Sequence, residues 1–256
     1  MSRYFIHMAY DGSDYFGWQI QPNEKTVQQV IEHALSTLLK QEIPVSGAGR
    51  TDTGVHASYF VAHFDHFSPE ATAVENSSKN YLPTSEQFVF KLNRFLPPDI
   101  VIYKITSVAE DMHARFSATY RTYHYHISTI KPIYKRNYSH YVFGELDEEA
   151  INNCCKVIME TTDFTSFAKL HTDVRTNNCK VTNAQWKKVE QAYLFEITAD
   201  RFLRNMVRSI TGTLLDVGCG KLDLDGFKKI VEAKDRAKAG SSAPAKGLFL
   251  VDIGYQ

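Results

Sequence analysis

One short glycine-rich segment carries the side chains best suited to chemistry. It reads Gly47-Ala-Gly-Arg50-Thr-Asp52-Thr-Gly54-Val-His56, so one arginine and one aspartate stand among three glycines. Glycine lets a chain turn tightly and lets the backbone approach a ligand closely. Such a loop could present the Asp52 carboxylate as a nucleophile or a base, with Arg50 favouring its ionised form. The simpler alternative is a tight turn whose Asp52 caps a helix.

Three familiar loop types fit these residues poorly. A dinucleotide fingerprint needs a third glycine where this chain has Asp52, and a carboxylate there would face the pyrophosphate. A phosphate-binding P-loop needs Gly-Lys-Ser/Thr, which this segment lacks. Asp52-Thr53-Gly54 spells the triplet of aspartic proteases, but Arg50 and Thr51 precede it where apolar residues are usual. A nearby arginine would also keep Asp52 ionised, whereas the protease pair must share a proton.

Basic charge is concentrated in the second part of the chain, although the net charge is zero. Residues 1–110 hold 8 Lys/Arg and 12 Asp/Glu, whereas residues 111–256 hold 21 and 17. No acidic residue stands between Asp111 and Glu145, a stretch with five basic residues, four histidines and eight Phe/Tyr residues. Basic groups interleaved with aromatic rings suit phosphate contact and base stacking. A tyrosine-rich strand and loop that happen to lack acids would explain this composition equally well.

Two further groups of residues could contact a substrate. Tyr123 could stack on a base with its hydroxyl near the reacting atoms, beside Arg121 on the same strand face. A cross-strand aromatic pair is the structural alternative for Tyr123. Arg201, Arg204 and Arg208 stand at i, i+3 and i+7, which would place them on one face of a helix. That face could meet an anionic ligand or simply face solvent.

Hydrophobic periodicity predicts the elements that must position these residues. In the first half we expect strands at 4–8, 59–64 and 100–105, a helix opened by Thr26, and a helix through 88–96. In the second half we expect a strand at 120–127, a helix capped by Asp147, a hairpin of 180–190 with 193–198, a helix 201–217 capped by Asp200 with Gly218 after its end, a helix near 227–231 and a strand at 248–253. Residues 68–86 have the composition of a surface loop. This order predicts two similar α+β halves, residues 1–107 and 108–256, each a mostly antiparallel sheet with helices on one face, and a cleft between them.

Composition narrows the class of protein. The 256 residues are 43% hydrophobic and 23% charged, which is typical of a globular chain and excludes disorder, collagen and coiled coil. No apolar run approaches membrane-spanning length, and no signal peptide opens the chain, so we expect a cytoplasmic protein without a membrane partner. The four cysteines form no C-x-x-C pair, which favours reduced core thiols over a zinc site.

Taken together, six segments resemble the tRNA pseudouridine synthase A (TruA) family, in the same order and across essentially the whole chain. They are Tyr10-Asp-Gly-Ser-Asp-Tyr-Phe-Gly-Trp18-Gln, Gly49-Arg-Thr-Asp52-Thr-Gly-Val-His56-Ala, His113-Ala-Arg115-Phe-Ser, Arg121-x-Tyr123, Asn205-Met-Val-Arg208 and Gly247-Leu-Phe-Leu. The resemblance implies isomerisation of uridine to pseudouridine at positions 38, 39 and 40 of the tRNA anticodon arm. It also implies a central, mostly antiparallel sheet, a homodimer, and neither a metal nor another cofactor.

The resemblance carries roles onto individual residues. Asp52 matches the essential aspartate, and Tyr123 matches the tyrosine that packs on the target base and can remove its C5 proton. Arg208 matches an arginine expected to pair with the aspartate, and Arg50 one near the flipped-out nucleotide. We also expect Arg115, Arg121 and Arg204 to bind the substrate.

Some residues depart from the family pattern. Thr53 stands where alanine is common, 203–205 read Leu-Arg-Asn where histidines are often found, and 68–86 is longer than usual. The sequence leaves open whether Asp52 attacks the sugar or removes a ribose proton, and which tRNAs are used. A tRNA-binding protein without catalysis and an aspartic hydrolase are the competing functions.

Overall fold

The computed structural model describes residues 2–66, 82–169 and 175–256, which divide into two compact units. The first unit is Met1–Ala118 with Tyr255–Gln256, and the second is Thr119–Gly254. We had expected the division at 107/108. It lies further along because residues 109–117 fold back onto the first unit, where the Ala114 amide donates to His63 Nδ1 (3.2 Å).

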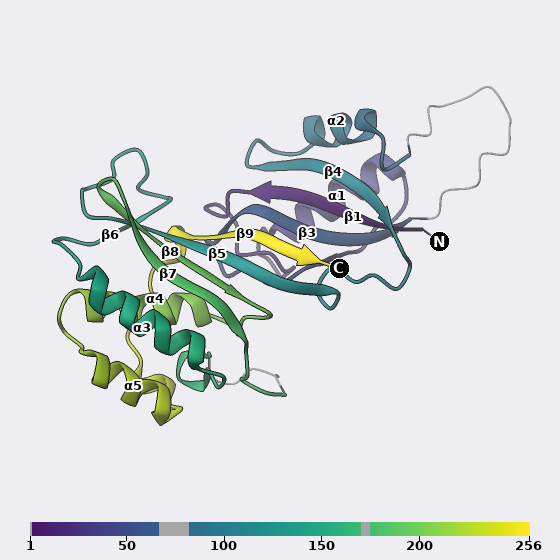
Figure 1. Ribbon diagram of the computed structural model, residues 1–256. Helices are drawn as coiled ribbons and strands as arrows, with labels where there is room; N and C mark the ends of the chain where they lie inside the picture. Colours follow the sequence, from purple (N-terminus) through teal and green to yellow (C-terminus); the bar gives the residue numbers. More distant parts are fainter. Residues whose placement is uncertain (1, 67–81, 170–174) are drawn as a thin grey trace, which may run out of the picture. The chain divides into compact units, whose positions relative to one another are not determined.

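The first unit is an antiparallel sheet with two helices. Its strands are β1 (Ser2–Tyr10), β2 (Val45–Gly47), β3 (His56–His66) and β4 (Ile100–Val108), and its helices are α1 (Val27–Leu39) and α2 (Glu86–Phe95). β1 lies between β3 and β4, and β2 pairs with β3 (Figure 1). Helix α1 packs against β2 and α2 against β4. The predicted strands and helices of this half are confirmed.

Local sequence explains the helix starts and the central strand. Thr26 caps α1 by accepting the Gln29 amide, and Ser85 caps α2 by accepting the Phe88 amide. Tyr4–Met8 are all buried, because β1 is covered on both faces. The expected surface loop at 68–86 falls mostly on residues 67–81, which lie outside the described part of the chain.

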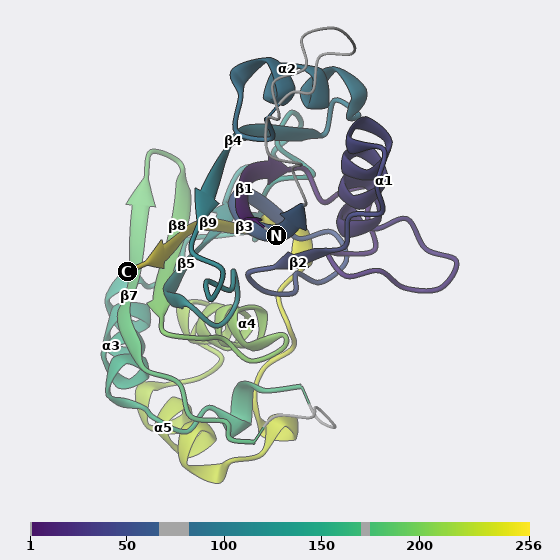
Figure 2. The same ribbon diagram turned by 90° about the vertical axis from the view of Figure 1, so that its right-hand side faces the viewer.

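The second unit has the order β9-β5-β8-β7, with β6 paired to β5 in parallel. The strands are β5 (Ala118–Ser128), β6 (His140–Tyr141), β7 (Val181–Val189), β8 (Ala192–Ala199) and β9 (Leu248–Tyr255), and the helices are α3 (Glu148–Glu160), α4 (Met206–Gly218) and α5 (Leu224–Ala233). Helix α3 packs on β7 and contacts α4 and α5, which places the helices on one side of this sheet (Figure 2). The α+β class, the β7–β8 hairpin and the Asp147 cap are therefore confirmed.

The helix expected to begin at Arg201 begins later. Helix α4 starts at Met206, after Asn205 in the left-handed region (φ 64°), and Gly218 is its last residue. The Asp200 carboxylate instead accepts the backbone amides of Lys180 (2.8 Å) and Arg201 (2.7 Å), so it closes the turn after β8. Arg201 and the arginine three residues on therefore precede the helix, and the prediction of one arginine face was wrong.

The cysteines are free, but they are not all core residues. Cys154, Cys155 and Cys179 are buried, whereas Cys219 is exposed at the end of α4, which corrects the prediction for that residue. Burial raises the pKa of the Cys154 thiol to about 11 and the pKa of both Cys155 and Cys179 to about 12.

Thiol labelling tests this difference. Because the thiolate is the reactive form, we expect a water-soluble disulfide reagent at pH 8 to modify one thiol per folded chain, at Cys219. A Cys219→Ser variant should lose the rapid phase, and denaturant should expose the other three thiols. Rapid modification of more than one thiol in the native protein would contradict the expectation.

None of the described helices has the length and apolar character needed to cross a membrane.

Candidate active site

Asp52 opens a tight turn in the first unit. The Val55 amide donates to the Asp52 carbonyl (3.1 Å), and Gly54 between them has φ 75°. That φ is the one required at the third position of a type II turn, where glycine is favoured. The Asp52 side chain is half-buried, while Thr51 before it is buried. Asp52 is thus a turn residue, and the helix-cap alternative does not hold.

The segment 10–18 braces this turn on both sides. The Trp18 amide donates to the Thr51 carbonyl (3.2 Å), and the Gly54 amide donates to the Tyr15 carbonyl (3.3 Å). The hydroxyls of Tyr10 and Thr51 share a buried hydrogen bond of 2.9 Å. Because the contacts fall immediately before and soon after Asp52, they fix the direction in which its carboxylate leaves the backbone.

Gly12 and His56 complete the brace. A Cβ on Gly12 would lie 2.0 Å from the Val55 carbonyl oxygen, so only glycine allows this approach. His56 is almost fully buried, and its Nδ1 lies 3.1 Å from the Gly12 amide and 3.0 Å from Asp11 Oδ1. Neither Gly12 nor His56 was predicted to position Asp52, and the two glycines on either side of Tyr15 were the available signal.

Aromatic side chains of the segment 10–18 attach it to the rest of the first unit. Trp18 stacks on Phe60 of β3, with ring centroids 4.2 Å apart. The buried Tyr15 hydroxyl donates to Asp99 Oδ1 (2.7 Å). Burial, together with Asp99, raises the pKa of Tyr15, so this phenol stays a donor at neutral pH. Arg50 is exposed in the same loop as Asp52.

In the second unit, the structure brings Tyr123 and Arg121 to the end of the β7–β8 hairpin. Tyr123 lies on β5 and meets Phe202 edge-on, with centroids 5.1 Å apart and an interplanar angle of 89°. Arg121 Nη1 donates to the Asp200 carbonyl (2.9 Å). Both contacts involve the segment after β8, so this segment supports the tyrosine side chain. The ring that Tyr123 meets edge-on thus belongs to a residue after β8, whereas its register partner on β8 is Ile197.

Arg208, on α4, is hydrogen-bonded to the segment that precedes β9. Its Nε donates to the Ala243 carbonyl (2.8 Å), and the Ala243 amide returns a bond to the Arg208 carbonyl (2.9 Å). The buried Tyr125 hydroxyl donates to the next carbonyl, that of Pro244 (2.7 Å). Burial raises the pKa of Tyr125, so it remains protonated. Residues 243–244 are thereby tied to both α4 and β5.

The other expected arginines lie on loops. Arg204 is exposed just before α4, and its carbonyl accepts the Lys169 amide (3.1 Å). Arg115 is exposed in the turn 113–117 of the first unit. The structure thus groups Arg50 with Asp52 in the first unit and Arg121 with Tyr123 in the second.

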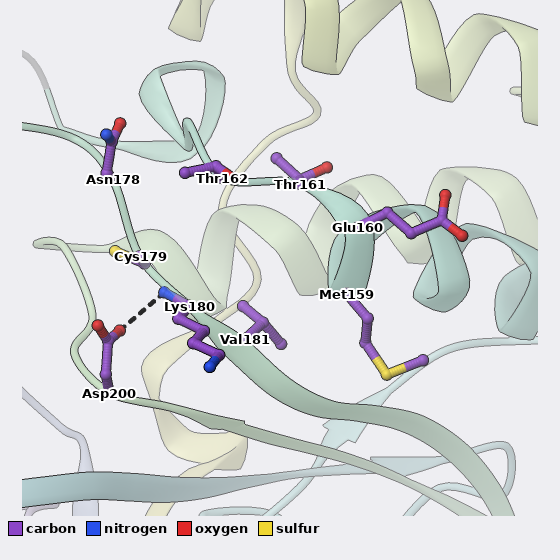
Figure 3. A pocket seen from close by; sticks show the side chains of 9 residues that line it. All are labelled: Met159, Glu160, Thr161, Thr162, Asn178, Cys179, Lys180, Val181 and Asp200. Carbon is purple, nitrogen blue, oxygen red and sulfur yellow. Dashed lines mark hydrogen bonds between the residues drawn. The ribbon is translucent and has the colours of Figure 1, made fainter.

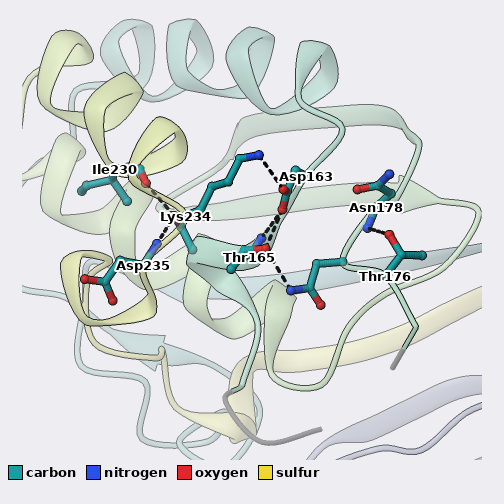
Figure 4. A network of polar contacts seen from close by, with 9 residues as sticks. Asp163, Thr165, Thr176, Asn178, Ile230, Lys234 and Asp235 are labelled. Atoms are coloured by element: carbon teal, nitrogen blue, oxygen red, sulfur yellow. Dashed lines mark hydrogen bonds and ion pairs between the residues drawn. The ribbon is translucent and has the colours of Figure 1, made fainter. Parts of the chain in front are cut away.

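Two other polar regions hold none of the predicted site residues. A hollow of about 390 Å³ lies where α3 ends and β7 begins, and Figure 3 shows its lining side chains, including Glu160, Cys179 and Lys180. Figure 4 shows a polar network in which Lys234 pairs with Asp163 (2.9 Å) and Thr165 donates to the same carboxylate. These contacts lower the pKa of Asp163 and fasten the end of α5 to the turn that follows α3.

The structure is that of an α+β protein that presents one carboxylate, that of Asp52, on a turn braced by main-chain hydrogen bonds, which is an arrangement suited to catalysis. A family model described as tRNA pseudouridine synthase matches residues 6–117 and 161–256. The chain belongs to the tRNA pseudouridine synthase family.

Curated relatives agree with this assignment. The chain is 52% identical to the tRNA pseudouridine synthase A of Bacteroides thetaiotaomicron, over 100% of this chain and 91% of the relative. It is 51% identical to that of Parabacteroides distasonis (100% and 96%) and 40% identical to that of Caldicellulosiruptor bescii (100% of both). The expected family is therefore confirmed.

Proposed function

We propose that this chain isomerises uridine to pseudouridine at positions 38, 39 and 40 in the anticodon arm of tRNA. The observation that carries the proposal is the Asp52 turn, which is braced by main-chain bonds to Tyr15 and Trp18. The reaction breaks the bond between ribose C1′ and uracil N1, turns the base, and joins C1′ to C5. The proton leaves C5 and one is gained at N1, so the product is an isomer of the substrate and no oxidant is consumed.

Asp52 acts as the nucleophile or the base in the proposed reaction. An ionised carboxylate can attack C1′ and hold the sugar covalently, or it can remove the ribose 2′ proton to give a glycal. Both routes need the carboxylate in a fixed position beside the ribose, and the braced turn supplies a fixed backbone. A target base in a stem must also leave its stack, which costs a few kcal/mol.

Tyr123 is proposed to pack on the displaced base and to take part in removing the C5 proton. Its edge-on contact with Phe202 supports this role by limiting how the ring can turn. We expect Tyr123→Phe to lower the single-turnover rate by about 10²-fold or more, because general acid–base contributions have that size. The tRNA affinity should stay near wild type, because phenylalanine keeps the stacking surface. An unchanged rate would remove the hydroxyl from the mechanism and leave stacking alone.

The arginines are proposed to hold the RNA. Arg50, Arg115, Arg121 and Arg204 would neutralise phosphates, so affinity should fall as salt rises. Arg208 keeps the role implied by resemblance, pairing with Asp52, and its Nε bond to the Ala243 carbonyl supports a fixed guanidinium orientation. We further propose a homodimer that works in the cytoplasm, where its tRNA substrate resides.

Tritium release tests the function directly. The substrate is an unmodified tRNA transcript labelled with tritium at uridine C5, with EDTA present and no added cofactor. We expect stoichiometric release from uridines 38–40, mapped afterwards by chemical marking of pseudouridine. Tight tRNA binding without release, across several tRNAs, would instead favour a binding protein that does not catalyse. Release only after metal addition would contradict a metal-independent reaction.

A further inference from the structure

The turn 113–117 presents the aromatic ring of Phe116 to solvent. Phe116 is 76% exposed, although it belongs to a turn whose other members are well ordered by hydrogen bonds. The Arg115 guanidinium carbon lies 5.5 Å from the centre of this ring, and the His113 ring lies 4.4 Å from it on centroids. One large apolar ring thus stands beside a cation and above a second ring.

The turn is rigid, because hydrogen bonds link its own residues to one another. The His113 amide donates to Ser117 Oγ (2.9 Å), and the Ser117 amide donates to the His113 carbonyl (2.9 Å). His113 Nδ1 lies 3.1 Å from the Arg115 amide and 3.4 Å from the Phe116 amide. These bonds close the turn around the two residues at its tip.

His63 on β3 anchors the turn to the sheet. Its Nδ1 accepts the buried Ala114 amide (3.2 Å), and its ring lies 4.4 Å from that of His113. Burial lowers the pKa of His63 to about 4, so the ring is neutral and can accept at pH 7. The Tyr255 hydroxyl donates to the Ala114 carbonyl from the other side (2.7 Å). Ala114 is therefore held on both its amide and its carbonyl.

We propose that Phe116 is a stacking site for a nucleobase of the substrate RNA, with the adjacent Arg115 guanidinium meeting that nucleotide's phosphate. The inference rests on the proposed function, and it adds Phe116, which was not among the expected site residues, to the phosphate contact already proposed for Arg115. An exposed aromatic ring can stack on a nucleobase, and a cation beside it can pair with the phosphate of the same nucleotide. A preorganised turn makes the contact without first having to order its backbone.

A second exposed phenylalanine provides a matched control. Phe90 on α2 is 62% exposed, and the Arg94 guanidinium carbon lies 6.0 Å from its ring centre. The pair has the same composition as Phe116 and Arg115, but it lies on a helix and lacks the histidine support. Its substitution therefore reports the general effect of removing an exposed ring beside an arginine.

The experiment compares Phe116→Leu, Phe116→Trp and Phe90→Leu with the wild-type chain. We measure the Kd for a fluorescein-labelled tRNA transcript and the single-turnover rate of tritium release at saturating enzyme. We expect Phe116→Leu to weaken binding about tenfold, because loss of one stacked base has roughly that effect, with the saturated rate and the Tm near wild type. Phe116→Trp, which keeps an aromatic ring, should bind tRNA with an affinity near wild type, and Phe90→Leu should leave the affinity unchanged.

Each other outcome counts against the stacking site. Equal weakening by Phe116→Leu and Phe90→Leu would show a general surface effect, and failure of tryptophan to restore binding would show that no base stacks there. A change of oligomeric state in sedimentation, with unchanged tRNA affinity, would assign the ring to a protein contact. If the wild-type chain releases no tritium, the proposed function fails, and the Kd series still decides whether Phe116 binds RNA.

Discussion

Asp52→Asn should abolish pseudouridine formation while leaving tRNA binding and the fold intact. Asparagine has nearly the same shape, so the main-chain bonds of Val55 and Trp18 around the turn can persist. It can neither attack C1′ nor remove a proton, so we expect the single-turnover rate of tritium release to fall by at least about 10³-fold. Losses of that size follow the removal of a group that forms or breaks the reacting bonds.

The matched measurements separate chemistry from structure. The Tm and the Kd for tRNA of Asp52→Asn should lie near those of wild type. Thr53→Ala serves as the control, because it changes the exposed neighbour of Asp52 and leaves the carboxylate in place. Retention of full activity by Asp52→Asn would remove Asp52 from the mechanism, whatever the behaviour of Thr53→Ala.

Gly12→Ala should damage both stability and catalysis, although residue 12 is remote in sequence from Asp52. The added Cβ would lie 2.0 Å from the Val55 carbonyl oxygen, and neither backbone can yield without breaking the brace. We expect a loss of about 1–3 kcal/mol in the free energy of unfolding, as for other overpacked sites. A displacement of the Asp52 turn by about 1 Å would lower the rate by about 10²-fold.

Gly49→Ala is the control for this prediction. Apart from Gly49 itself and its two chain neighbours, no residue has an atom within 4 Å of a Cβ built there, so the change should alter the free energy of unfolding by less than about 0.5 kcal/mol. Urea unfolding measures the stability, and tritium release at saturating enzyme measures the rate. If Gly12→Ala behaved like Gly49→Ala in both measurements, the segment 10–18 would not be positioning Asp52.

Most helices and strands were predicted correctly where hydrophobic periodicity and helix-capping residues within the segment were enough to define them. The α1 stripe of Val27, Ile31 and Leu35 is buried, and Thr26 and Asp147 cap the helices that they were expected to cap. The predicted start of α4 was five residues too early, because the Asp200 carboxylate can accept hydrogen bonds from two different groups of backbone amides. It could cap a helix at Arg201, but in the fold it accepts the amide of Lys180, which lies beside it at the open end of the β7–β8 hairpin.

The exposure of Cys219 was mispredicted for a related reason. Burial of a cysteine depends on what packs over it, and Cys219 follows the last residue of α4, where the chain leaves the core. The short strands β2 and β6 were also missed, since two or three residues carry no periodicity.

The sequence by itself determined the α+β class, the family and the loop that contains Asp52, because these depend on residue types and spacing along the chain. Only the tertiary structure decided how that loop is held. The bonds from Tyr15 and Trp18 to residues 51–54 join segments more than thirty positions apart, and no local pattern encodes such pairs. The same holds for His63 and Ala114, fifty-one positions apart, whose bond orients the exposed ring of Phe116. Every residue except proline can donate a main-chain hydrogen bond, so the partner of such a bond is set by the packing of the sheet and not by the residue types.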